Sequence, residues 1–168
     1  VHVNRGTFTV AEGVGLTVAG LDQTFRQEAG RFDLLGGGDF SALRFEFLGG
    51  AIVGTPYLDG CTLLIPTANS GPGSFIVTRS ATQILGELHA GQTVWVRGDN
   101  RGGHTVITLA PEFANRGTLR VESVHGGYTS GVSKPEGSLV NRAGGQILFN
   151  PGAGGARVLA AELVNEGT

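Results

Sequence analysis

Short runs of alternating polar and apolar residues recur along the whole chain. Residues 7–10 are Thr-Phe-Thr-Val and residues 118–121 are Thr-Leu-Arg-Val. A period of two over four residues is typical of a short β-strand with one buried face. The same alternation occurs at residues 16–18, 31–34, 43–47, 93–96, 104–107 and 146–149. Because glycine pairs or triplets separate many of these runs, the pattern predicts an all-β solenoid, sandwich or barrel.

A repeated corner sequence narrows the choice among these folds. Val3-Asn4-Arg5-Gly6-Thr7 differs from Val164-Asn165-Glu166-Gly167-Thr168 at one position, at an offset of 161 residues. Residues 114–118 are a third copy, and residues 139–142 are a degenerate fourth. The asparagines of the last three copies are 26 and 24 residues apart, which is the length of one coil of a β-helix. The chain is therefore expected to form a single parallel β-solenoid segment over residues 1–168, with about seven coils of roughly 24 residues.

The Asn-x-Gly-Thr sequence suits a solenoid corner. Asparagine and glycine tolerate a left-handed backbone, and threonine can begin the next strand. An asparagine amide can also bond to the equivalent amide one coil away, which would give a ladder along the stack. The residues assigned to these turns and ladders are Asn4, Gly6, Thr7, Asn115, Gly117, Thr118, Asn141, Asn165 and Gly167.

Composition supports a folded β-protein and excludes some partners. The chain of 168 residues has 30 glycines, 40% apolar residues and only 15% charged residues. A net charge of −2 and the absence of a basic cluster argue against nucleic-acid binding. No apolar run is long enough to predict a membrane span. Methionine is absent, even at position 1, so we expect a processed chain or an excerpt of a longer one.

These corner motifs resemble the glycine-rich repeats of giant bacterial surface proteins, namely autotransporter passenger domains and filamentous-haemagglutinin-like adhesins. The resemblance lies in residues 4–10, 115–121 and 150–159. It implies a right-handed parallel β-helix in an extracellular or cell-surface fibre, and it carries over no catalytic residue.

The offset of 161 residues adds a hypothesis about organisation. It suggests that one long repeat occurs in tandem in a larger protein. No polar capping segment is evident near residues 1–10 or 160–168, and uncapped solenoid ends are adhesive. We therefore expect the partners to be copies of the chain or adjacent repeats, stacked end to end.

Candidate chemistry is sparse. A single Gly-Gly-Gly-Asp sequence at residues 36–39 weakly suggests calcium, with Asp33, Asp39 and Asp59 as oxygen donors, although no cofactor is expected. The tripeptide Arg97-Gly98-Asp99, which integrins read in other proteins, is explained more simply as a β-turn. Cys61 is the only cysteine and lies in an apolar run, as is typical of a buried residue.

Two further functions remain as alternatives to a structural or adhesive role. A polysaccharide lyase or hydrolase would need acids such as Asp22 and Asp99 to converge on one face, and no catalytic motif supports it, so no enzyme is expected. A module that binds carbohydrate or another surface ligand would use exposed aromatic rings. Trp95, Tyr57 and Tyr128 are the candidates, and Trp95 is the best of them because it alternates with Val94 and Val96.

Overall fold

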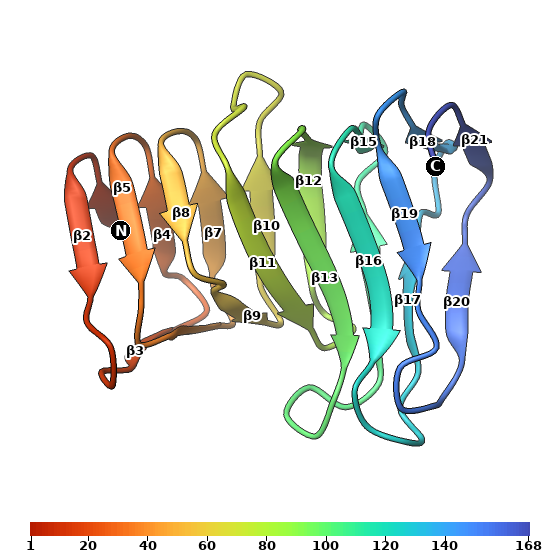
Figure 1. Ribbon diagram of the computed structural model, residues 1–168, viewed down its shortest axis with the longest axis horizontal. Coiled ribbons are helices and arrows are strands. Elements are labelled where there is room, and N and C mark those ends of the chain that lie inside the picture. Colours follow the sequence, from red (N-terminus) through yellow and green to blue (C-terminus); the bar gives the residue numbers. More distant parts are fainter.

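The computed structural model describes residues 1–168 as a β-solenoid with no helix. The chain winds through about seven turns with a repeat of about 23 residues, and all strand pairs between coils are parallel. Figure 1 shows the coils stacked along the long axis, with the first coil at one end and the last at the other. The fold class and the approximate coil length predicted from the sequence are confirmed. No element of this all-strand structure is a helix that could cross a membrane.

Two long sheets form the main sides of the stack. The first sheet contains β1 (His2–Asn4), β4 (Thr24–Gln27), β7 (Arg44–Phe47), β10 (Thr62–Ile65), β12 (Gln83–Leu88), β14 (Thr105–Leu109), β17 (Ser130–Ser133) and β20 (Arg157–Ala160). The second sheet contains β3 (Leu16–Ala19), β6 (Gly38–Ser41), β9 (Tyr57–Asp59), β11 (Gly73–Thr78), β13 (Gln92–Gly98), β16 (Thr118–Ser123) and β19 (Gln146–Phe149).

The remaining strands make a narrower side that changes along the stack. In the first three coils it is a separate sheet of β2 (Thr7–Val10), β5 (Arg31–Leu34) and β8 (Ala51–Val53). In the last coils it consists of β15 (Ala114–Asn115), β18 (Leu139–Asn141) and β21 (Leu163–Asn165). These three strands join the first sheet through β12, which pairs with β14 at its start and with β15 at its end.

The coils differ in length, and the difference is absorbed at the corners. Thr62 pairs with Arg44, whereas Gln146 pairs with Thr118, so the later coils are longer. Figure 1 shows longer strands in the second half of the stack. Strand registers are nevertheless kept from coil to coil, because a slip of one residue would turn every buried side chain outward.

The core consists of inward-facing side chains stacked in columns along the axis. Phenylalanines fill the first half, where Phe25 and Phe45 lie one above the other with ring centroids 5.2 Å apart. Aliphatic residues such as Leu119 and Val121 fill the second half and are fully buried. The alternation seen in the sequence therefore maps directly onto inside and outside.

The apolar columns are uncovered in the two end coils. Phe8 stacks on Phe32 at 5.4 Å, and Phe149 pairs with Val121, so both continue core columns. Phe8 is nevertheless 41% exposed and Phe149 38% exposed, because no further coil lies beyond them in this structure. Each of these two rings therefore packs against the core on one side only.

Candidate functional site

A column of amide side chains lies at the corner where β15, β18 and β21 end. Asn115 donates through Nδ2 to Oδ1 of Asn141 at 2.7 Å, and Asn141 donates in the same way to Asn165 at 2.7 Å. Asn115 and Asn141 are fully buried. At the opposite end, Asn4 donates to Oε1 of Gln27 at 2.7 Å. Each of these amides therefore joins one coil to the next.

Two of these asparagines, Asn115 and Asn4, also close their own turns. Oδ1 of Asn115 accepts from the Gly117 amide at 3.2 Å, and Oδ1 of Asn4 accepts from the Gly6 amide at 3.3 Å. In addition, Asn115 Nδ2 donates to the Gln146 carbonyl of the next coil at 2.9 Å. One side chain thus satisfies polar groups both within its turn and across coils.

The glycine of this motif serves a purpose that differs from the one predicted. Gly117 and Gly167 do not have left-handed backbone angles, so the expected conformational reason is wrong for them. A side chain at either position would instead collide with a carbonyl oxygen of the preceding coil, that of Gln92 or of Gly145. Glycine is needed there because two backbones approach closely.

Three members of the column were not predicted from the sequence: Gln27, which accepts from Asn4, and also Asn69 and Gln92. Asn69 is 3% exposed, donates to the Phe47 carbonyl at 2.7 Å and accepts from the Gly71 amide at 2.9 Å. Gln92 donates to the Gly71 carbonyl at 2.8 Å. Residues 69–71 do repeat the Asn-x-Gly signal, but Pro72 rather than threonine follows them.

Arginine–carboxylate pairs flank the column on the exposed side of the corner. Arg5 contacts Glu28 at 2.6 Å, and Arg116 contacts Glu87 at 2.6 Å. Arg142 lies 4.0 Å from Glu166. Each pair bridges neighbouring coils, and at the two ends of the stack the paired residues directly follow corner amides, Arg5 and Glu28 at one end and Arg142 and Glu166 at the other.

Of the aromatic residues proposed as a contact surface, Trp95 and Tyr57 occupy the same register of the second sheet two coils apart, and Tyr128 lies elsewhere. The Arg97 guanidinium lies against both of the first two rings. Trp95 lies on the outer face of the second sheet, since Val94 and Val96 are fully buried. The guanidinium of Arg97 lies 5.1 Å from its ring and that of Arg120 lies 4.3 Å away, which are cation–π distances. Tyr128 lies at another corner, where its ring is 5.5 Å from His104.

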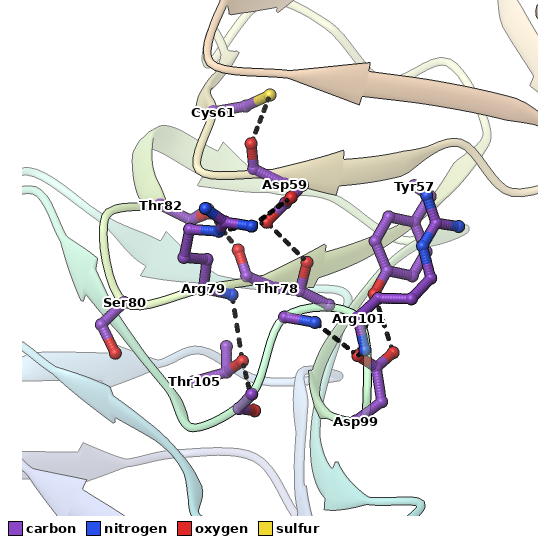
Figure 2. Close-up of polar contacts among 12 residues, drawn as sticks. Tyr57, Asp59, Cys61, Thr78, Arg79, Ser80, Thr82, Asp99, Arg101 and Thr105 are labelled. Atoms are coloured by element: carbon purple, nitrogen blue, oxygen red, sulfur yellow. Dashed lines mark hydrogen bonds and ion pairs between the residues drawn. The ribbon is translucent and has the colours of Figure 1, made fainter. Parts of the chain in front are cut away.

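Tyr57 is buried, and Figure 2 shows its side chain beside Arg101 and Asp99 of the loop that follows β13. The Arg101 guanidinium covers the Tyr57 ring at 3.9 Å from its centroid. The Tyr57 hydroxyl donates to the Asp99 carboxylate, whose two oxygens lie 3.0 and 2.8 Å away. Burial, together with the hydrogen bond to the Asp99 carboxylate, raises the pKa of Tyr57. The ring is therefore a support for the loop and is not displayed.

Asp99 organises this loop. Its carboxylate accepts from the Arg101 and Gly102 amides at 2.9 and 2.8 Å, and from Arg97 Nε at 2.8 Å. Burial alone would raise the pKa of Asp99, but the bonds from Gly102, Tyr57 and Arg97 outweigh it and hold the pKa below its usual value. Since Asp99 is 3% exposed and bonds Arg97, the Arg97-Gly98-Asp99 tripeptide does not display its acid.

The three acids considered for calcium each face an arginine. Asp33 contacts Arg31 at 2.5 Å, Asp39 contacts Arg101 at 3.0 Å, and Asp59 contacts Arg79 at 2.8 Å. No three histidine, cysteine, aspartate or glutamate side chains lie close enough together to hold a metal ion.

Cys61 is buried beside the Asp59–Arg79 pair. Its Sγ lies 3.3 Å from the Phe40 carbonyl and 3.7 Å from the Asp59 carbonyl, the second of which is drawn in Figure 2. Burial raises the pKa of the Cys61 thiol. The residue behaves as a small core side chain.

Lys134, the single lysine, is also buried, which the sequence did not indicate. Its Nζ donates to the carbonyls of Ala110 and Pro111 at 2.7 and 2.5 Å, and burial lowers its pKa. The ammonium thus ties β17 to the turn that follows β14.

Comparisons of the chain with protein-family models, curated proteins and solved structures found no match. The structure defines the class of fold, a parallel β-solenoid. The resemblance to bacterial surface repeats rests on the corner motifs alone.

Proposed function

We propose that the chain is a structural segment of an extracellular or cell-surface fibre, in which β-solenoid coils continue end to end. Its function would lie in the length and stiffness of the rod and in its exposed loops. The proposal assigns no catalytic residue and no cofactor.

One observation carries this proposal: the groups of each coil find their partners in the neighbouring coil. Backbone strands pair in parallel, corner amides bond along the axis, arginines meet carboxylates, and apolar side chains stack. The strand pairing and the apolar columns extend through the whole stack, whereas bonds between amide side chains join the first two and the last three coils. All of these series are still incomplete in the end coils. Such an arrangement favours addition of coils over binding at one defined pocket.

The end coils support continuation in particular. Apolar side chains of both are exposed, among them Val3, Phe8, Leu159 and Leu163. The edges of β1 and β21 also carry unpaired backbone groups, which are ready to pair with another strand.

A fused pair of copies tests the proposal. The two copies share one corner, so that Val164–Thr168 of the first copy replaces Val3–Thr7 of the second. Small-angle X-ray scattering should then show one straight rod of about twice the length of a single copy. Two units that tumble independently would contradict the proposal. A matched fusion with a flexible glycine–serine linker at the junction gives the reference for independent units.

Binding of carbohydrate or another surface ligand remains an alternative function, favoured by the outward position of Trp95. Arg97 and Arg120 lie against its ring, so a sugar could stack only by displacing one of them. Titration of the chain with oligosaccharides, followed by Trp95 fluorescence, tests this alternative. A saturable fluorescence change would support it if Trp95→Phe also lost oligosaccharide binding in a separate binding assay. A flat fluorescence response would contradict it.

A further inference from the structure

No contact within the chain itself requires glycine at position 6. At the other corners of this kind a side chain would collide with a carbonyl of the preceding coil, for example at Gly71, Gly117 and Gly167. Gly6 has nothing within 4 Å of the place where a side chain would begin, and its backbone is not left-handed. Gly30, the counterpart of Gly6 in the second coil, would collide with the Gly6 carbonyl. At Gly6 the first coil therefore leaves room for the backbone of a further coil.

The corner amides give the stack a direction at its two ends. The asparagines nearest each end donate toward higher residue numbers, from Asn4 to Gln27 and from Asn115 through Asn141 to Asn165. Asn165 therefore presents a donor without a partner, and Asn4 presents an acceptor that is engaged only by the Gly6 amide at 3.3 Å. These two groups are complementary to each other.

The flanking charges are complementary in the same sense. Glu166 follows Asn165 and faces Arg142, whereas Arg5 follows Asn4 and faces Glu28. If Asn165 lay beside Asn4, the order along the corner would be Arg142, Glu166, Arg5 and Glu28. Charges would alternate in sign across the junction.

The apolar surfaces of the two ends also fit this arrangement. The first coil surrounds an open hollow of about 670 Å³, lined by Phe8, Val18 and Phe25 among others. The last coil presents Phe149 and Leu163, which continue the buried columns of Val121 and Leu139. Stacking the ends would cover both sets.

We propose that the last coil of a second copy covers the first coil, in a parallel head-to-tail contact with Val164 beside Val3 and Asn165 beside Asn4. The contact places Glu166 beside Arg5 and a carbonyl of the Glu166–Gly167 corner against Gly6. The inference rests on the proposed stacking function and specifies its partner. Because the two surfaces differ, the contact does not close on itself and generates filaments.

Two glycine variants test the register by sedimentation velocity over a range of concentrations. The wild-type chain of 17.3 kDa is expected to form a ladder of growing species. Gly6→Ala should remain monomeric while keeping the urea stability of the wild type, because its new methyl group meets no atom of its own chain. Gly15→Ala is the matched control. It lies in the same coil with open space, and its counterpart Gly37 stays open although a coil covers it, so assembly should persist.

A charge exchange tests the partner. Arg5→Glu and Glu166→Arg should each assemble at least about tenfold more weakly than the wild type, and an equal mixture of the two should recover assembly, since every junction then joins opposite charges.

Each failure points to a different conclusion. If the wild type assembles and neither Gly6→Ala nor the charge exchange changes this, the proposed register is wrong although stacking stands. If the wild type stays monomeric at all concentrations while the fused pair forms one rod, the second-copy contact is wrong and the structural function stands. If the fused pair also behaves as two independent units, both proposals fail.

Discussion

The corner amide column allows a quantitative comparison between two asparagines that look alike in the sequence. Asn141 is fully buried and takes part in four hydrogen bonds: it accepts from Asn115, and it donates to Asn165 and to the Gly145 and Thr168 carbonyls. Asn165 is exposed and only accepts from Asn141. A buried hydrogen bond contributes about 0.5–1.5 kcal/mol net.

Asn141→Ala should therefore lower the free energy of unfolding by about 2–4 kcal/mol, with the two 2.7 Å amide bonds contributing most. Asn165→Ala should cost less than about 1 kcal/mol, because Asn141 keeps its two carbonyl acceptors and the lost group is solvated. Asn100→Ala, in an exposed loop, controls for the substitution itself.

Urea unfolding measures these differences, at a protein concentration too low for assembly. The fluorescence of Trp95 and far-ultraviolet circular dichroism should give coincident transitions if unfolding is two-state. If Asn141→Ala lies within about 0.5 kcal/mol of Asn165→Ala, the amide column does not stabilise the fold and our reasoning about the corner is wrong.

Three further outcomes follow from burial. Phe45→Ala, in the fully buried ring stack, should cost about 3–5 kcal/mol, and Phe149→Ala less than half of that, as measured by urea unfolding; equal costs would contradict the uncovered end. Folding lowers the pKa of Asp99 below its ordinary value of 3.8. The stability that the ionised carboxylate contributes to the fold is therefore present above pH 3.8 and is lost as the pH falls through the pKa of the folded state. Asp99→Asn should flatten this acid-side decline, and an unchanged pH profile would contradict it. Cys61 should react with an aromatic disulfide reagent only after urea is added, and rapid reaction of the native chain would show that the site opens.

Local pattern accounts for the elements that could be predicted. Residues 118–121 alternate because Leu119 and Val121 enter the core while Thr118 and Arg120 remain outside. The spacing of Asn115, Asn141 and Asn165 was informative because each occupies the same place in successive coils. These relations repeat with the coil, so one sequence suffices to find them.

Relations that depend on uneven coil length could not be predicted. Tyr57 and Asp99 are 42 residues apart and meet only because the loop after β13 reaches back across two coils. Asn69 lies between Pro66 and Pro72, which interrupt the alternating pattern, so the local sequence does not mark its corner. The reason for glycine at Gly117 lies in the Gln92 carbonyl, which belongs to another coil and leaves no trace in the local sequence.

The placement of all inter-coil hydrogen bonds along the rod axis has a mechanical consequence. Force applied between residues near the two ends of the stack would act along these bonds and open them one strand at a time, rather than shear a whole sheet together. The rod should therefore yield by peeling single coils at low force, in a saw-tooth series. A coil of about 23 residues would release roughly 70 Å of extended chain. The shorter early coils would release less and the longer later coils more, so a stack of many coils would lengthen in a series of separate steps.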